Sequence, residues 1–179
     1  LTGASRDKSD VLVSPDGAQW TRPDPLPGEC SQSVRGLAGG GGVIVISTGD
    51  GHVCASSDGG ASFQVTRDVG DIDTAPIYDG QRFMIWGSDG MLTSADGLNW
   101  TVTELTTKVT LGSVARNPQT GTRVAVRGGW KKWYEDQRFY RSTDGLTWEE
   151  LPEGSYVGSH PIRDITFGWA PAGTTCPPR

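Results

Sequence analysis

The sequence contains little histidine and little cysteine, and this scarcity excludes the common metal centres. There are two histidines, His52 and His160, and three cysteines, with no C-x-x-C or H-x-x-x-H pattern. A structural zinc site needs four nitrogen or sulfur ligands at close spacing. Asp71 and Asp73 offer oxygen ligands to calcium, but two carboxylates in one loop are more often solvated. We therefore expect no metal and no cofactor.

Long apolar runs and an excess of positive charge are also absent. The longest aliphatic run is Val43 to Ile46, whereas a membrane-spanning helix needs about 18 apolar residues or more. The formal net charge is -5 and the only close basic pair is Lys131 and Lys132, while nucleic-acid binding needs a concentrated basic face. We expect neither a membrane span nor a nucleic-acid partner. Because the chain begins at Leu1 without a methionine or an apolar leader, we expect an upstream segment to have been removed.

Glycine is the residue that the sequence has in abundance. The 179 residues include 26 glycines and 11 prolines, and no stretch keeps an apolar period of 3.6. This composition favours many short strands and turns over helices. A chain of this length buries roughly 70% of its unfolded surface, so we expect a single all-β domain over residues 1–179.

A short sequence pattern occurs four times. Its copies are SPDGAQW (14–20), SSDGGASF (56–63), SADGLNW (94–100) and STDGLTW (142–148). Their aspartates are spaced 42, 38 and 48 residues apart, close to the ~40–45 residues of one four-stranded propeller blade. The copies therefore predict a repeat architecture. The four aspartates are Asp16, Asp58, Asp96 and Asp144.

Each copy has the residues of a tight hairpin turn. The aspartate can accept backbone N–H groups, the glycine adopts a positive φ without steric cost, and the aromatic ring can fill the gap between neighbouring sheets. Strand-like residues precede each copy and a short strand-like run follows it. The aromatic residues assigned to these gaps are Trp20, Phe63, Trp100 and Trp148. Two more strands per repeat are expected upstream, at 34–38 and 43–47, 76–78 and 83–86, and 113–116 and 123–127.

The repeated pattern resembles the Asp-box, or BNR repeat, S-x-D-x-G-x-T-W, of sialidase-like β-propellers. The resemblance covers essentially the whole chain, although three of the four copies lack one residue between the aspartate and the aromatic. It implies four-stranded antiparallel blades. In that family the boxes lie at the blade edge away from the ligand, which implies that Ser142, Asp144, Trp148 and their equivalents are structural.

Two arrangements fit the four visible blades. In one, a final inner strand at Ile162–Phe167 joins N-terminal strands that begin at Leu1–Ser5, and the ring closes with four blades, which hides the sheet edges. In the other, the chain is part of a larger propeller of about six or seven blades, as in many of the sialidase-like proteins that it resembles.

The three cysteines leave one unpaired in any monomeric scheme. Cys54 shares a strand column with Leu12, Leu92 and Tyr140, so we expect it to be a small buried hydrophobe. Cys30 and Cys176 would then meet in the blade where the chain ends join, and a Cys30–Cys176 disulfide would clasp the ring. A disulfide favours an oxidising compartment, so an extracellular or cell-surface location is expected.

The loop over residues 128–137 is the first candidate ligand site. The connections between second and third strands and those between blades gather on one face of a propeller, and this loop is the longest of them, which is often a sign of function. Trp130, Trp133 and Tyr134 could stack on a sugar ring or an apolar side chain, and Lys131 and Lys132 could hold an anion. The alternative is that the aromatic residues pack over a neighbouring blade or form a protein contact.

A second candidate cluster lies at the beginnings of the inner strands on the same face. Arg35 and Arg163 align there, with His160 and Asp164 near the second. Paired arginines bind a carboxylate by bidentate hydrogen bonds, as arginines do in the sialidases that the chain resembles. The alternative is that Arg163 forms a salt bridge with Asp164. The sequence over 160–163 is not the Arg-Ile-Pro motif of sialidases, which argues against sialidase activity.

Three functions remain open from the sequence. The first is an extracellular recognition propeller that binds a glycan or a protein through the face carrying residues 128–137, and this one requires no catalysis. The second is a sialidase-like or glucanase-like glycoside hydrolase, or part of one, with Asp73 and Asp164 among the candidate acids. The third is a structural subunit of an assembly, in which a second chain completes the propeller.

Overall fold

Strands provide nearly all the regular structure of the chain. In a computed structural model, the described residues are 2–5, 8–14, 16–22, 25–128, 138–152, 154, 162 and 164–168. Across these ranges, a single 3-10 turn, η1 (Gly28–Cys30), is the only helical element. The strands are β1 (Thr2–Ser5), β2 (Lys8–Val11), β3 (Val34–Gly40), β4 (Val43–Thr48), β5 (His52–Ser56), β6 (Gln64–Asp68), β7 (Ile77–Tyr78), β8 (Phe83–Gly87), β9 (Gly90–Ser94), β10 (Thr101–Thr103), β11 (Leu111–Arg116), β12 (Arg123–Arg127), β13 (Phe139–Ser142) and β14 (Glu149–Glu150).

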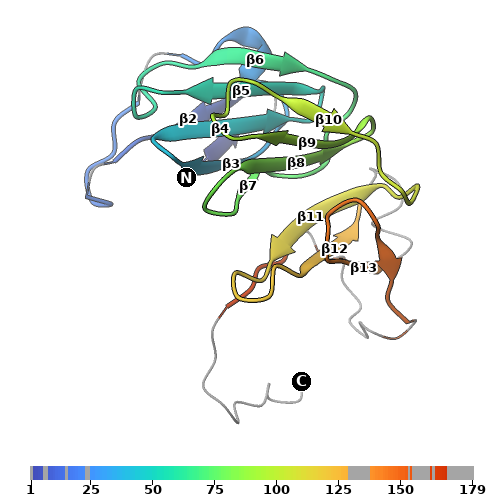
Figure 1. The fold of residues 1–179 in the computed structure, drawn as a ribbon. Coiled ribbons are helices and arrows are strands. Elements are labelled where there is room, and N and C mark those ends of the chain that lie inside the picture. The colour runs from blue at the N-terminus through green and yellow to red at the C-terminus, as the bar shows by residue number, and fades with distance from the viewer. Residues whose placement is uncertain are drawn as a thin grey trace.

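The strands form three antiparallel four-stranded sheets and one two-stranded sheet (Figure 1). We call β3–β6 the first blade, β7–β10 the second blade and β11–β14 the third blade. In each blade the strands pair in sequence order, so every connection is a hairpin. The two-stranded sheet β1–β2 is followed by a backbone bridge between Val13 and Thr21. We call β1, β2 and this bridge the N-terminal sheet.

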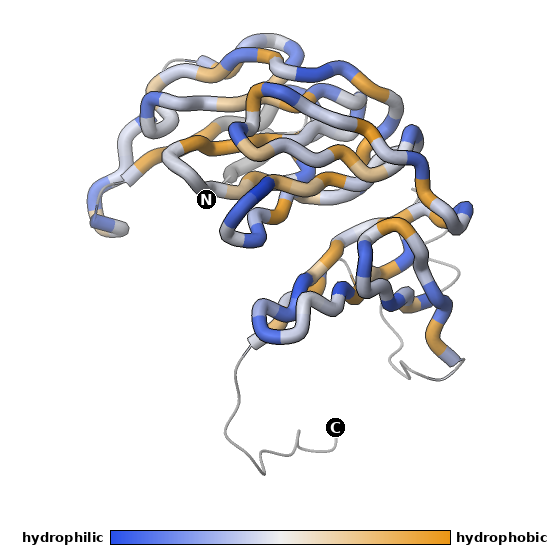
Figure 2. The backbone as a smooth tube through the Cα atoms, in the orientation of Figure 1, coloured by the Kyte–Doolittle hydropathy of each residue, from blue (hydrophilic) through white to orange (hydrophobic). Residues whose placement is uncertain are grey.

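The burial of the second strand in the first and second blades shows how the sheets stack. In β4 and β8, four consecutive side chains are buried, because both faces of these strands lie against other sheets. A strand that is covered on both sides has a continuous hydrophobic sequence, as in Phe83–Trp86 of β8. In β4 the buried run is Val45–Thr48, in which two apolar residues are followed by Ser47 and Thr48. The outer strands β6 and β14 are mostly exposed and polar. Figure 2 shows the hydrophobic residues along the inner strands and hydrophilic residues at the turns.

In the three blades, the repeated segments form the turns between the third and fourth strands, and the first copy forms the turn between the bridged residues Val13 and Thr21. In all four, the serine Oγ accepts the N–H of the turn glycine at 2.8 Å. In the last turn, Asp144 Oδ1 accepts the N–H groups of Leu146 and Thr147, both at 2.8 Å. We call residues 14–20, 56–63, 94–100 and 142–148 the aspartate turns. Each carboxylate accepts backbone N–H groups of the turn that would otherwise have no hydrogen-bond partner.

The glycine of each complete blade's aspartate turn lets that turn approach the preceding blade closely. Gly145 has a φ of 84°, and a Cβ added there would lie 2.8 Å from Met91 Sδ in the second blade. A Cβ at Gly97 would lie 2.8 Å from Val43 in the first blade. Glycine is required for two reasons. A side chain would strain the backbone at this positive φ, and it would collide with the neighbouring sheet.

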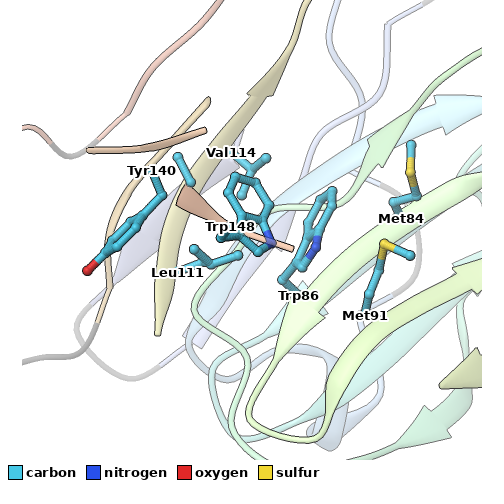
Figure 3. Packing of buried hydrophobic residues seen from close by; sticks show 8 residues of the cluster. Met84, Trp86, Met91, Leu111, Val114, Tyr140 and Trp148 are labelled. Atoms are coloured by element: carbon cyan, nitrogen blue, oxygen red, sulfur yellow. The ribbon is translucent and has the colours of Figure 1, made fainter. Parts of the chain in front are cut away.

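The aromatic residue of each turn fills the space between two sheets. Trp148 is buried among residues of the second and third blades (Figure 3). Its ring makes an edge-to-face contact with Trp86, with 5.9 Å between centroids. Both indole N–H groups donate to the carbonyl oxygen of Gly145, at 2.7 Å from Trp86 and 3.0 Å from Trp148. Trp100 and Phe63 pack in the same way at the two earlier gaps.

Trp20, the aromatic residue of the first aspartate turn, differs from the other three. Its side chain is 44% exposed, and a Cβ at the adjacent turn glycine, Gly17, would have nothing within 4 Å. No described sheet lies against this turn. The expectation that every one of these rings fills a gap between sheets is therefore wrong for Trp20.

The blades do not close into a ring. The N-terminal sheet makes no backbone pairing with the third blade among the described residues, and Ile162 and residues 164–168 form no strand. Asp164 instead accepts a hydrogen bond from Ser113 Oγ in β11. The predicted inner strand at Ile162–Phe167, and with it the closed four-bladed ring, is therefore wrong in this structure.

The disulfide joins a different pair of cysteines from the one predicted. Cys30 is bonded to Cys54, with their Cα atoms 6.0 Å apart and a sequence separation of 24 residues. The turn η1 places Cys30 against β5, and both cysteines are fully buried in the core between the N-terminal sheet and the first blade. The Cys30–Cys176 prediction is wrong because Cys54 was assigned to apolar packing alone. Cys176 lies outside the described residues.

We predict that the aspartate turns make stability depend on acid pH. Hydrogen bonds from the backbone N–H groups of Thr147 and Leu146 lower the pKa of Asp144 from its usual 3.8 to about 2. Because the folded pKa is depressed, this stabilisation is complete above pH 3.8 and is lost as the pH falls to about 2. The melting temperature of Asp144→Asn should therefore fall less between pH 4 and pH 2 than that of the wild type. Equal falls would contradict this, and Asp68→Asn on the exposed strand β6 is the control.

We predict that the Cys30–Cys54 bond contributes substantially to stability. For a closed loop of this length, the chain-entropy model gives about 3 kcal/mol. Urea unfolding of the Cys30→Ala/Cys54→Ala variant should show a loss of that order. Peptide mapping without reduction should recover Cys30 linked to Cys54, and Cys176→Ala should leave the unfolding free energy unchanged. Recovery of a Cys30–Cys176 pair would contradict the structure.

Candidate functional site

A cleft of about 730 Å³ opens between the first, second and third blades. Its walls come from the connections between second and third strands and from the segments that link one blade to the next. These are the connections in which the sequence analysis places the ligand. The lining residues are Arg35, Gly49, Asp71, Asp73, Trp86–Gly90, Glu104, Leu105 and Thr107–Leu111.

Arg35 crosses the cleft from β3 to the segment that leads into the second blade. Its Nε donates to the carbonyl oxygen of Ile72 at 3.1 Å, and its Nη2 donates to Asp73 Oδ1 at 3.2 Å. The guanidinium lies against Gly49, where a Cβ would be 2.6 Å from Nη2. The side chains of Arg35 and Asp73 are 36% and 27% exposed. Arg35 therefore lines the cleft, and the Asp73 carboxylate already accepts a hydrogen bond from its guanidinium group.

Carboxylates predominate on the rim of the cleft. Asp71, Asp89 and Glu104 are exposed there, and Lys108 is the only cation besides Arg35 among the described residues that line the cleft. Four carboxylates of this lining, counting Asp73, therefore face two cations. The described lining consequently carries a net negative charge, which raises the local concentration of cationic groups.

Backbone and side-chain hydrogen bonds fix the rim loops in place. Asp89 Oδ2 accepts the N–H of Gly70 at 3.1 Å, and the N–H of Ser88 donates to the carbonyl oxygen of Asp71 at 2.8 Å. These bonds tie the β8–β9 hairpin to the segment between the first and second blades. The rim is thus built before any ligand arrives, which lowers the entropy cost of binding.

The floor of the cleft is apolar. Trp86 and Leu111 are buried there, and Leu105 and Val109 pack against the same core between the second and third blades. An apolar floor with a few charged groups around it is typical of a recognition pocket. Figure 3 shows Trp86 and Leu111 within this core.

The loop predicted to bind ligand begins beside this cleft. Residues 129–137, which contain Trp130, Lys131, Trp133 and Tyr134, lie outside the described residues. The residue before them, Gly128, donates its N–H to the carbonyl oxygen of Thr110 at 2.9 Å, and Thr110 lines the cleft. The other end is held where Arg138 accepts the N–H of Arg127 at 2.9 Å. Both ends of the loop are therefore anchored to the third blade, with Gly128 next to the cleft wall.

The second predicted cluster is only partly visible. His160 and Arg163 lie outside the described residues. Asp164 bonds to Ser113 and is not among the residues that line the cleft, so it is not brought together with Asp73. The described residues contain no group of three or more metal-ligating side chains. None of the helical structure described for the chain is long and apolar enough to cross a membrane.

Asp89, Glu104 and Lys108 also line the cleft, although no sequence motif marks them. Each lies in a hairpin or linking segment on the predicted face, so strand phase alone was a sufficient signal for them. Their convergence on one cleft depends on the rotation between successive blades, which no local pattern encodes.

Comparison with known proteins identifies the fold. No protein-family model and no curated protein matches the chain. Among solved structures, YCF48 bound to a D1 peptide is similar with a TM-score of 0.60 and 16% identity, over 91% of this chain and 54% of that one. A GH74 enzyme of Niastella koreensis is similar with a TM-score of 0.58 and 14% identity, over 84% of this chain and 27% of that one.

An ancestral GH74 enzyme has a TM-score of 0.54 and 16% identity, over 84% of this chain and 25% of its own. The chain thus spans about half the length of YCF48 and about a quarter of each GH74 enzyme. At these identities the likeness shows the fold alone. The chain has a β-propeller fold of four-stranded antiparallel blades, and the fold class predicted from the sequence is confirmed.

Proposed function

We propose that this chain is a recognition module that binds a polypeptide ligand in the cleft between its three blades. The observation that carries the proposal is the cleft itself, with its apolar floor and its preformed, mostly acidic rim. A polypeptide offers apolar side chains to such a floor and charged side chains to such a rim. The likeness to YCF48, which is bound to a peptide in its structure, supports this choice.

The charge of the rim indicates which peptides fit best. Asp73 is paired with Arg35 at 3.2 Å, so Asp71, Asp89 and Glu104 remain against Lys108. Complementary charge mainly increases the association rate and the specificity of a complex. We therefore expect a ligand segment that carries lysine or arginine beside an apolar anchor residue. Trp130, Trp133 and Tyr134 would extend the apolar contact, and Lys131 would contact an acidic ligand residue.

The remaining features fit an extracellular propeller of the Asp-box type. The aspartate turns have the residues of that repeat, and their hydrogen bonds show why each is needed. The Cys30–Cys54 disulfide is stable in an oxidising compartment. We propose that the protein acts in such a compartment, outside the cell or at its surface.

The decisive test is selection of peptides on the wild type and on a rim variant. Peptides enriched from a random display library on the wild type should be rich in lysine and arginine. They should bind the Asp71→Lys/Glu104→Lys variant at least tenfold more weakly at low salt, because the rim charge is reversed. The variant Glu29→Lys/Glu149→Lys carries the same change of net charge away from the cleft and should bind normally. Equal binding to both variants would reject the cleft as the site.

Glycan recognition or hydrolysis is the second candidate, and the acidic rim favours it too. A glycoside hydrolase needs two carboxyl groups about 5–10 Å apart across the scissile bond, and the rim offers Asp71, Asp89 and Glu104. The fold likeness to GH74 enzymes is consistent with such a use. Turnover of a β-glucan or sialoside panel that is lost in Glu104→Gln would replace the peptide proposal. Binding of a glycan array that is lost in Trp130→Ala/Trp133→Ala would point to a lectin.

A role as an assembly subunit rests on the exposed face around Trp20. This turn has the same residues as three turns that pack against a sheet, yet its tryptophan is 44% exposed. A second chain that completes the propeller would cover it. Native mass spectrometry of the wild type and of Trp20→Ser should then show an oligomer only in the wild type.

A further inference from the structure

One position in the third blade breaks a rule that the first two blades obey. In every blade, the serine of the aspartate turn lies directly opposite a residue of the second strand. The partners are Ile44 for Ser56, Phe83 for Ser94 and Arg123 for Ser142. Two of these residues are apolar, and the third is an arginine. The third blade thus has a charged side chain, Arg123, at a position that is apolar in the first two blades.

The first strand of the third blade shows the same exception, an arginine in place of an uncharged residue. The residue opposite Ile44 is Gly39, and the residue opposite Phe83 is Tyr78, whose ring lies 4.7 Å from that of Phe83. The residue opposite Arg123 is Arg116. Like charges directly opposite each other destabilise an antiparallel pair. The third blade therefore carries two adjacent guanidinium groups in place of an apolar pair.

Arg123 is held rigidly inside the protein. It is 5% exposed, and its Nη1 donates to the carbonyl oxygens of Gly121 at 3.2 Å and Thr143 at 3.0 Å. Its Nη2 lies 3.4 Å from Met84 Sδ, and its Nε is buried without a partner. Burial first, and the nearby charge of Arg116 second, lower the pKa of this guanidinium. A buried charge of this kind is costly unless an opposite charge compensates it.

The second blade adds another arginine and a single carboxylate to this junction. Arg82 Nε lies 3.8 Å from Asp79 Oδ2, and Asp79 Oδ1 accepts the N–H groups of Gln81 and Arg82. Burial acts to raise the pKa of Asp79, but those two bonds and the charge of Arg116 outweigh it and lower the pKa. Asp79 is therefore an anion, and three guanidinium groups share it.

In the described part of the chain, Asp144 is the only other carboxylate that acts on the charge of Arg123. Asp144 is nearby, but its oxygens already accept four hydrogen bonds within its own turn. Among the described residues, Arg116 makes no hydrogen bond or ion pair, and its Nε is buried without a partner. The junction thus holds an excess of positive charge in a protein whose net charge is -5.

We propose that Arg82, Arg116 and Arg123 bind a tetrahedral oxyanion, a phosphate or sulfate group, at the junction of the second and third blades. Guanidinium groups bind such anions through paired, charge-assisted hydrogen bonds. Arg82, which is 50% exposed, and the half-buried Arg116 supply donors, and the buried Arg123 supplies a fixed charge beside them. The site lies at the β7–β8 and β11–β12 turns. These are at the opposite edge of the blades from the cleft, so the proposal does not depend on peptide binding.

The test is a thermal titration with inorganic phosphate and, separately, inorganic sulfate, at constant ionic strength balanced by sodium chloride. Ligand that binds only the folded state raises the melting temperature in a saturable way. We expect such a rise for the wild type, and at least a tenfold increase in the half-saturating concentration for Arg116→Gln. Arg141→Gln, an exposed arginine of the same blade, should titrate like the wild type. No saturable rise for either anion, or the same curve for Arg116→Gln, would overturn the proposal.

A second variant removes the charge of Arg123, which the other two blades lack at this position. Arg123→Leu restores an apolar side chain at this position, so it should fold and should lose the response to both anions. An unchanged response in Arg123→Leu would overturn the assignment of Arg123. Titration with a sulfated disaccharide and its desulfated form then identifies the source of the group. A preference for the sulfated sugar over free sulfate supports a glycan ligand, and the reverse supports a free anion.

Discussion

The hydrogen bonds between an aspartate carboxylate and the backbone of its turn hold the rest of this structure in place. In the three blades, each aspartate turn positions a glycine that touches the neighbouring sheet and an aromatic ring that fills the space beside it. Where a preceding sheet is present, as at Trp148 and Trp100, the ring is covered. The turn therefore acts at two levels, because it closes a hairpin and also sets the spacing between blades.

Because the aspartate turns stabilise one edge of the blades, the loops at the opposite edge are free to bind ligand. The hairpins and linking segments there have no shared sequence, and they differ in length and charge from blade to blade. Arg35 and Asp73 join two blades across this edge at 3.2 Å, which stiffens the cleft without filling it. The arginines at the β7–β8 and β11–β12 turns are the exception at the edge that carries the aspartate turns, because Arg123 stands where the first two blades have an apolar residue.

The sequence predicted those parts of the fold that depend on local patterns. The turns, the inner strands β3, β7 and β11 and the all-β class follow from spacing, glycine positions and apolar runs, and each is present in the structure. The pairing of Cys30 with Cys54 was not predictable in this way, because Cys54 also satisfies the apolar column it shares with Leu92. The exposed Trp20 and the absent strand at Ile162–Phe167 depend on which sheets stack against which. The order of the strands predicted which connections face the cleft. The pairing of Arg35 with Asp73 depends instead on the angle between blades.

Hydrogen–deuterium exchange on the complex with a selected peptide tests the central claim most directly. That claim is that ligand binds at the edge opposite the aspartate turns. We expect slower exchange in residues 70–73, 87–90 and 104–110 on binding, with no change in residues 56–63, 94–100 and 142–148. Protection of the aspartate turns, with the first three segments unchanged, would contradict it.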